Sequence, residues 1–225
     1  WSCYQKLAYY NPVPYAAFFP FEGFTIVSAS PECLIRKSRD RLITRPIAGT
    51  RKKKGGREDR AAIEELRQDP KEQAEHAMLV DLSRNDMSRI SKPGSVLVTG
   101  LCEIVEYQTL YHIESEVKGL VRENLSALDC LAGMFPGGTI TGVPKRRTME
   151  LISELEPNSR GIYTGSLGYF GFAGEMDFNI LIRSLLIQDG IAYLNGGGGI
   201  TIDASSKLEF KETINKVRAQ LMALS

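Results

Sequence analysis

The stretch SPECLIRKSRDRLITRPIAGTRKKKGG, residues 30–56, sets two short β-type runs around a polar turn and ends in a basic, glycine-broken loop. The runs lie at residues 33–36 and 41–45, and two similar runs, YAAFFP and FTIVSA, come just before them. Runs of this kind between turn residues predict an antiparallel meander. Glu32 lies between two of the runs, and the passage is either a hairpin with a charged tip or one wall of an active site.

Downstream segments group as blocks of helix and strand. Two charged helical segments, residues 57–69 and 70–90, are predicted to meet at Asp69, because proline is tolerated at the first position of a helix. Residues 94–121 are predicted to form two or three strands. Two helices follow, NLSALDCLAGMF and KRRTMELISELE, on either side of the loop FPGGTITGVPK. A strand series then runs through GIYTGSLGYFGF, MDFNILIRSLLIQDG and IAYLNGGGGITID, with a hairpin turn at QDG, and a last helix extends from Ser206 to the C-terminus. Strands grouped in this way predict an α+β fold with large antiparallel sheets rather than alternating βαβ units.

Composition sets the class of protein. With 225 residues, 43% hydrophobic and 24% charged, the chain has enough apolar residues for a core and is predicted to form one domain over residues 1–225. A net charge of +1 gives no reason to expect nucleic acid or a membrane surface as a partner. No apolar run approaches the roughly 18 residues of a membrane span and no leader opens the sequence, so we expect a cytoplasmic location. Trp1 begins the sequence inside a helical pattern, which indicates a fragment.

Four cysteines are spread along the chain without CxxC spacing, which favours buried reduced thiols over disulfides or a zinc site. They are Cys3, Cys33, Cys102 and Cys130.

Two predicted helices open with a capping residue followed by two glutamates: Asp69, Glu72 and Glu75 in one, and Ser206, Glu209 and Glu212 in the other. Glutamates three positions apart share a helix face. In one interpretation these are capping-box acids and solvated charges, with Lys216 as an i,i+4 partner of Glu212. In the other, four carboxylates converge on a hard cation, and Mg²⁺ is the cation that often binds through a substrate's own anionic group. Since capping accounts for the first glutamate of each pair, Glu75 and Glu212 are the predicted direct ligands, and Glu72 and Glu209 act through water.

Two glycine-rich segments and one arginine could bind an anion. The run GGGG at residues 196–199 is either a tight turn or a place where bare backbone N–H groups approach a carboxylate. FPGGTITGVPK, residues 135–145, carries two hydroxyls before a helix. Arg183, within the apolar run NILIRSLL, needs an anionic partner, and an internal glutamate or a substrate carboxylate would serve.

The chain has two histidines. His76 follows Glu72 by four residues on a helix and is predicted to be structural. His112, in an apolar strand, is either a satisfied core histidine or a proton carrier. The basic loop RKKKGGR is interpreted as a mobile, solvated tip, with anion steering as the alternative. Transition-metal, GxSxG, GxGxxG and P-loop patterns are absent from the sequence.

Seven segments, taken together, closely resemble the chorismate-utilising enzymes in order and spacing over essentially the whole chain: SPE, RPIAGTR, AEHAMLVDLSRND, FPGGTITGVPK, MDFNILIR, GGGGI and EFKETINK. The chain is similar to the C-terminal part of anthranilate synthase component I and aminodeoxychorismate synthase component I. More distantly, it is similar to isochorismate and salicylate synthases.

The resemblance implies a fold of two large antiparallel sheets packed together with helices outside. It implies that Glu75 and Glu212 bind Mg²⁺ with Glu72 and Glu209 around it, and that the cation holds the ring carboxylate of chorismate. The implied substrate-binding residues are Ala48, Gly49 and Thr50 of the PIAGT turn, Tyr163, Arg183, Gly197, Gly198, Gly199 and Lys216. The implied groups near the ring are His112, Thr139 or Thr141, and Glu32. Glu32 matches a general acid for departure of the 4-hydroxyl, and burial would have to raise its pKa for this role.

The branch of the family is decided by a few residues. Many aminodeoxychorismate synthases have a nucleophilic lysine where this chain has Ala48, and anthranilate synthases have alanine there. FPGGTITG and GGGGI resemble the aminodeoxychorismate branch instead. We therefore predict Mg²⁺-dependent amination of chorismate to 4-amino-4-deoxychorismate in folate biosynthesis, without covalent catalysis at position 48. Ammonia would come from a glutamine amidotransferase partner, because the chain has no Cys-His glutaminase site of its own.

Other functions remain open at this point. The first alternative is anthranilate synthase component I, which forms anthranilate and pyruvate for tryptophan biosynthesis. An isochorismate or salicylate synthase would use water in place of ammonia, and in those enzymes a general-base lysine opposite Glu32 comes from the upstream region that this fragment lacks. A non-catalytic remnant is the remaining alternative, but it should have lost some of these buried charges.

Overall fold

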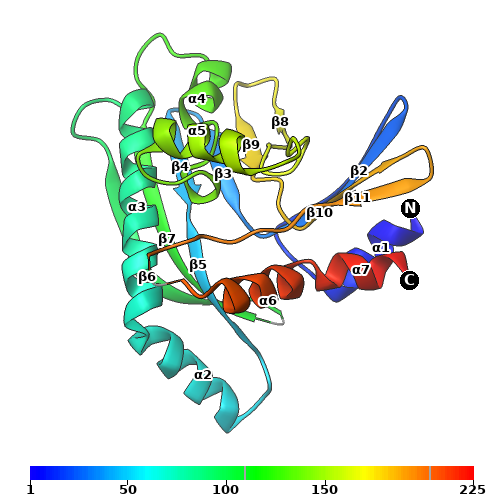
Figure 1. Ribbon diagram of the computed structural model, residues 1–225. Helices are drawn as coiled ribbons and strands as arrows, with labels where there is room; N and C mark the ends of the chain where they lie inside the picture. The colour runs from blue at the N-terminus through cyan, green and yellow to red at the C-terminus, as the bar shows by residue number, and fades with distance from the viewer. Residues whose placement is uncertain (109, 203) are drawn as a thin grey trace. The chain divides into compact units, whose positions relative to one another are not determined.

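The computed structural model describes residues 1–108, 110–202 and 204–225 (Figure 1). These residues form two units: unit 1 is Trp1–Pro31, Glu150–Leu167 and Ile180–Ser225, and unit 2 is Glu32–Met149 and Gly168–Asn179. Each unit contains one antiparallel sheet together with helices, which confirms the predicted α+β class. One catalytic domain over residues 1–225 stays a prediction.

Unit 1 is built on a four-stranded sheet with the order β1-β2-β10-β11. Its elements are α1 (Ser2–Tyr10), β1 (Tyr15–Phe21), β2 (Phe24–Ser30), β10 (Ser184–Gln188), β11 (Ile191–Leu194), α6 (Ser206–Lys216) and α7 (Arg218–Leu224). Central strand β2 alternates, so that Val27 and Ala29 enter the core while Ser28 bonds to Ser184 at 2.8 Å. Helices α1 and α7 lie side by side (Figure 1) and contribute Leu7 and Ala223, respectively, to the same core.

Unit 2 is built on a seven-stranded sheet with the order β5-β7-β4-β3-β9-β8, and β6 also pairs with β7. Its elements are β3 (Cys33–Ser38), β4 (Arg41–Arg45), β5 (Ile47–Lys52), α2 (Arg57–Gln68), α3 (Pro70–Ile90), β6 (Leu97–Glu106), β7 (Leu110–Leu120), α4 (Ala127–Met134), the 3-10 turn η1 (Gly138–Ile140), β8 (Gly168–Phe170) and β9 (Met176–Asn179). The long helix α3 contacts β5, β6 and β7 and also carries α4 and η1 (Figure 1). Helix α5 (Lys145–Leu155) begins in unit 2 and ends in unit 1.

The predicted meander is wrong. Strands β1 and β2 form one hairpin in the sheet of unit 1, and β3 and β4 form another in the sheet of unit 2. Strand β2 has β10 on its other edge, and β3 has β9 on its other edge. Sequence-adjacent strands were expected to pair, but in both sheets the second neighbour comes from at least 139 residues away, which a local pattern does not encode.

Several predicted strands are shorter than their apolar runs. Arg183 lies in a bend with φ 51°, between β9 and β10, and not inside a strand. Residues 161–164 form turns, and residues 195–200 after β11 have no regular secondary structure. The QDG hairpin is confirmed, because Asp189 and Gly190 at φ 52° and 75° have the left-handed pair that a tight β10–β11 turn requires.

Helices α3 and α6, which have similar sequences at their N-termini, differ in how those N-termini are capped. Helix α3 begins as predicted after Asp69, whose carboxylate accepts from the backbone N–H of Lys71 and Glu72 at 3.0 and 3.2 Å. The predicted capping box at Ser206 is wrong, because that residue is already helical and the N-cap Ser205 makes no side-chain cap bond. The predicted single C-terminal helix is also interrupted, at Val217, between α6 and α7.

All four cysteines are free thiols, as predicted, but only Cys33 and Cys130 are buried, whereas the other two are half-buried. Over the described parts of the chain, none of the helices combines the length and the apolar character that crossing a membrane requires.

Candidate functional site

The PIAGT turn is fixed by close packing in unit 2. Strand β5 has an irregular register against β7 between Ala48 and Thr50, and Gly49 there has φ 56°. A Cβ on Gly49 would lie 2.7 Å from Leu66 Cδ1 and 3.1 Å from Glu72 Oε2. Glycine is therefore required both by its left-handed backbone and by the space available. The turn therefore packs against the carboxylate of Glu72, the first glutamate of the predicted acidic pair on α3.

His112 of β7 lies against the same turn. Its Nδ1 is 3.0 Å from the Gly49 carbonyl oxygen and 3.0 Å from Thr50 Oγ1. A carbonyl can only accept, so Nδ1 carries the proton. The ring is 2% exposed and meets the edge of Tyr107 at 5.3 Å between centroids. His112 is thus a buried, hydrogen-bonded histidine in contact with two predicted substrate-binding residues.

Glu32 lies at the entrance to β3 and is 6% exposed. The next residue, Cys33, is paired with Arg45 on one side and Asn179 on the other, so the backbone beside the carboxyl is held in the middle of the sheet. This burial is the condition that a general-acid role requires, because a desolvated carboxyl keeps its proton more readily.

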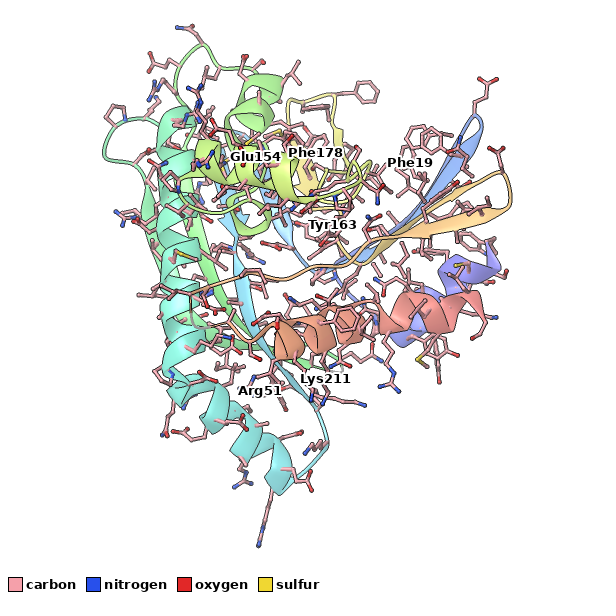
Figure 2. The ribbon with its side chains drawn as sticks, viewed as in Figure 1. Phe19, Arg51, Glu154, Tyr163, Phe178 and Lys211 are labelled. Atoms are coloured by element: carbon pink, nitrogen blue, oxygen red, sulfur yellow. The ribbon has the colours of Figure 1, made fainter. Side chains whose placement is uncertain are left out.

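The acidic pair of α3 faces an arginine from β5. Arg51, labelled in Figure 2, lies 3.4 Å from Glu72, 3.2 Å from Asp69 and 3.0 Å from Glu65. Burial raises the pKa of Glu72, and Arg51 opposes that rise. Glu75, one turn along the helix, is 3.7 Å from Lys71. The pair therefore has two different environments on one helix face.

The basic loop after Arg51 is only partly a solvated tip. Lys52 and Lys54 are exposed, as predicted. However, the backbone N–H groups of Lys54 and Gly55 donate to Asp59 at 2.7 and 2.9 Å, and Lys53 bonds to Glu106. The loop is ordered by the first turn of α2.

His76 is structural in position, as predicted. It is fully buried, and its Nε2 lies 2.7 Å from Ser115 Oγ, which also accepts from the backbone of Cys102 at 2.9 Å. Burial lowers the pKa of His76 to about 4. This histidine fixes the face of α3 that packs on β7.

The loop at residues 135–145 also packs on α3. The Thr139 hydroxyl is buried and, among the described residues, has no hydrogen-bond partner, whereas Thr141 donates to the Gly137 carbonyl at 2.9 Å. Lys145 pairs with Asp86 at 2.7 Å, and the Asp86 side chain is 3% exposed. This ion pair was not predicted from the sequence. Its signal was an aspartate placed four residues after Leu82 and four before Ile90, on the apolar face of a helix.

In unit 1 the structure gathers several predicted substrate-binding residues around the glycine run. A Cβ on Gly197 would lie 2.9 Å from the Tyr163 hydroxyl, and one on Gly198 would lie 3.4 Å from Lys216 Nζ and 3.5 Å from Glu209 Oε2. Glycine therefore lets a bare backbone come up to a hydroxyl, an ammonium and a carboxylate. A hydroxyl, an ammonium and unshielded N–H groups are the donors that bind a carboxylate.

Lys216 also pairs with Glu212 at 2.8 Å, which confirms the i,i+4 pair of the first interpretation. Gly199 and Arg183 are the two remaining predicted substrate-binding residues of unit 1. Gly199 has open space around its Cβ position. Arg183 is half-buried in its bend.

Arg160, which the sequence analysis did not consider, supports Tyr163. Its guanidinium lies 5.8 Å from the centre of the Tyr163 ring and 2.6 Å from Glu156, and it donates to Thr164 at 3.3 Å. Burial raises the pKa of Tyr163, while Arg160 opposes that rise. A cation over the ring holds Tyr163, labelled in Figure 2, by a contact that ordinary spacing rules do not predict.

The predicted Mg²⁺ ligands form one pair in each unit. Glu72 and Glu75 lie in unit 2, and Glu209 and Glu212 lie in unit 1. All four offer the hard oxygen donors that Mg²⁺ prefers, and the partly desolvated Glu72 carboxylate would gain from a cation. Among the described residues, no group of three or more His, Cys, Asp or Glu side chains is placed to hold a metal ion, and the Mg²⁺ site stays a prediction.

The sequence and the fold of this chain are similar to those of several known proteins. The chain is 46% identical to aminodeoxychorismate synthase component 1 of Bacillus subtilis (strain 168) over 225 residues, which is 100% of this chain and 48% of that protein. It is 47% identical to anthranilate synthase component 1 of Pseudomonas putida over 223 residues, or 99% of this chain and 45% of that one. The crystal structure of anthranilate synthase component I from Streptococcus pneumoniae TIGR4 matches with a TM-score of 0.89 and 40% identity, over 97% of this chain and 48% of that one.

The chain thus spans about half the length of the curated relatives it matches. The family model for chorismate binding enzyme matches residues 1–222. The chain belongs to the chorismate binding enzyme family.

Proposed function

We propose that this protein aminates chorismate to 4-amino-4-deoxychorismate with ammonia and Mg²⁺. The observation that carries the proposal is the group in unit 1 where Tyr163 and Lys216 meet the bare backbone of Gly197 and Gly198. It is a carboxylate-binding arrangement, and chorismate is a dicarboxylate. Arg183 would serve the same substrate.

Unit 2 would supply the reacting groups. Glu32, buried at 6% exposure, would donate a proton to the departing 4-hydroxyl, so that the carbon–oxygen bond breaks and water leaves. Ammonia would form the new carbon–nitrogen bond, and the proton that the resulting ammonium group loses would restore the acid form of Glu32. His112, held through Nδ1 by Gly49 and Thr50, would lie beside the ring with Thr139 or Thr141.

Mg²⁺, when bound, would neutralise the ring carboxylate of the substrate and fix its orientation. Glu75 and Glu212 are the proposed direct ligands, and Glu72 and Glu209 the proposed water-mediated ones. Arg51 would keep Glu72 ionised and aimed along its helix face. Lys216 would keep Glu212 in place.

Amination at C4 is supported by the motifs FPGGTITG and GGGGI, and by the Bacillus subtilis relative. Alanine at position 48 leaves no amine there for a covalent intermediate. A glutamine amidotransferase is the proposed source of ammonia in the cell.

Ala48 favours a second candidate, anthranilate synthase component I, and the Pseudomonas putida relative has that name. In that reaction amination at C2 is followed by loss of pyruvate and formation of an aromatic ring.

Product analysis separates the candidates. The full-length protein would be given chorismate, Mg²⁺ and ammonium salt, with and without an aminodeoxychorismate lyase. We expect 4-aminobenzoate only when the lyase is present. Anthranilate and pyruvate without lyase would favour the second candidate. Isochorismate or salicylate would show that water is the nucleophile, and unchanged chorismate under all conditions would favour a non-catalytic remnant.

Gly197→Ala tests the carboxylate arrangement. The added methyl would lie 2.9 Å from the Tyr163 hydroxyl, so we expect KM for chorismate to rise about tenfold with little change in unfolding midpoint. Tyr163→Phe removes the atom that the methyl meets, so the two changes together should raise KM by less than the product of their separate effects. Independent effects that multiply would contradict the proposed contact.

A further inference from the structure

One face of α3 receives a continuous piece of chain. Leu82, Asp86 and Ile90 are four residues apart and therefore share a face. A Cβ on Gly138 would lie 2.5 Å from Leu82, and one on Gly133 would lie 2.3 Å from Ile90. The backbone is therefore pressed directly onto the helix at both ends of this face. We call these three side chains the α3 track.

The middle contact of the track is ionic. Lys145 Nζ lies 2.7 Å from Asp86 Oδ2 and donates to the Pro136 carbonyl oxygen at 2.8 Å. The same ammonium thus joins the first residue of the loop 136–145 to its last and fastens both to α3. The side chains of Asp86 and Lys145 are 3% and 18% exposed.

A buried ion pair of this kind does not stabilise a fold more than apolar side chains in the same positions would. Removing two charges from water is costly, and well-packed apolar residues of similar volume are often as stabilising. Burial raises the pKa of Asp86, and Lys145 opposes the rise, which is consistent with a desolvated pair. What the pair supplies beyond an apolar contact is a fixed distance and direction.

The loop that it fastens carries Thr139 and Thr141. Thr141 is already bonded to the loop backbone, through the Gly137 carbonyl. The hydroxyl of Thr139 is buried and has no hydrogen-bond partner among the described residues, so the loop holds one unsatisfied hydrogen-bonding group.

We propose that Asp86 and Lys145 are positioning residues that lock the loop 136–145 onto the α3 track and so set the threonine hydroxyls for the substrate. The inference rests on the proposed function, since it takes Thr139 or Thr141 to contact chorismate. Neither Asp86 nor Lys145 is assigned a contact with the substrate.

The test compares four variants in the full-length protein. Asp86→Asn and Lys145→Met each break the pair, and the double variant Asp86→Leu with Lys145→Met replaces it by apolar side chains. Asp81→Asn is the matched control, because it breaks the exposed pair of Asp81 with Arg84 on the same helix. Each is measured for kcat and KM with chorismate and ammonium salt, for its urea midpoint, and for hydrogen exchange of the loop amides.

We expect the double variant to unfold near the parent midpoint, with kcat/KM lower by about 30-fold because a displacement on the order of 1 Å disables an aligned group. Loop amides should exchange at least about tenfold faster. The control should match the parent. A folded double variant with kcat/KM within about twofold of the parent would overturn the inference.

Two results separate the inference from the proposed function. If the parent itself does not consume chorismate, the proposed function fails and the exchange data decide whether the pair fastens the loop; unchanged exchange overturns that too. If single variants do not fold, Lys145→Arg keeps the charge but lengthens the anchor. It should fold with a lower kcat, and an unchanged kcat would count against positioning.

Discussion

Helices α3 and α6 open with the same glutamate spacing but have different surroundings. Helix α3 starts at a bonded Asp69 cap and buries seven residues, including His76 directly after Glu75. Helix α6 starts at Ser205 without a side-chain cap bond and buries none of its residues. The spacing of two glutamates therefore fixes which helix face they share, but not how far that face is desolvated.

The difference reaches the carboxylates themselves. Glu75 and Glu212 occupy the same position of the motif and are 31% and 54% exposed, and each is paired with a lysine of its own helix. Glu72, the first glutamate of α3, is 23% exposed and is paired with Arg51 from strand β5. A tertiary partner therefore fixes Glu72, whereas local i,i+4 partners fix Glu75 and Glu212.

The largest expected effect is at Glu75 and Glu212, the proposed direct Mg²⁺ ligands. Glu75→Gln and Glu212→Gln should each lower Mg²⁺-dependent turnover about 100-fold or more, because an amide lacks the charge that would hold the cation. Glu72→Gln and Glu209→Gln, at the proposed water-mediated ligands, should lower turnover about tenfold. Turnover is measured across an Mg²⁺ titration, with urea midpoints to confirm folding.

Glu58→Gln is the control, since Glu58 is an exposed glutamate of α2 that is paired with Lys54 in the preceding loop. Full activity of Glu212→Gln at ordinary Mg²⁺ concentrations would remove α6 from the metal assignment, and the repeated motif would then be a surface pattern on that helix.

An effect of intermediate size is expected in the pH dependence of the unfolding free energy, through the buried His76 of α3. The pKa of His76 is about 4 when folded, below its ordinary value near 6.5, so the unfolded chain binds an extra proton between these values. The stability that neutral His76 confers is complete above about pH 6.5 and is lost as the pH falls toward 4, by up to about 3 kcal/mol.

His76→Gln removes the titration and should flatten the dependence of the unfolding free energy on pH across that window. Urea unfolding at a series of pH values measures it, with the parent as reference. Parallel curves for variant and parent would mean that some other group titrates there.

The smallest expected effect is on the unfolding free energy, when the N-cap residues of α3 and α6 are replaced. Asp69→Ala should cost about 1 kcal/mol, because it removes the acceptor for two backbone N–H groups of α3. Asp69→Asn keeps a capping oxygen and isolates the loss of charge opposite Arg51. Ser205→Ala on α6 should change the free energy of unfolding by less than about 0.5 kcal/mol. Equal losses at Asp69 and Ser205 would show that the capping difference is not expressed in solution.

Local patterns predicted the elements well. The start of α3 at Asp69, the QDG hairpin and the helical character of Ala127–Met134 all depend on residues within a few positions of one another. A further capping box, Ser126 with Asp129, could have been found in the same way. The meander failed because strand neighbours are chosen by side-chain packing over the whole sheet.

The candidate site was predicted unevenly for the same reason. The residue types around Gly197 were evident from the sequence, but the approach of Tyr163 and Lys216 to it depends on packing. Asp86 and Lys145, 59 residues apart, are unremarkable charges in the sequence and form a buried pair only in the fold.

The sequence by itself indicated the family, through the resemblance of its seven motifs to known enzymes. It also predicted the α+β class and the positions of the acidic pairs, through the grouping of strands and helices and the spacing of the glutamates. Only the tertiary structure decided that the first four strands belong to two sheets, that Glu72 is held by Arg51, and that His112 carries its proton on Nδ1. Those features depend on desolvation and on contacts between segments distant in sequence, and both arise only when the chain folds.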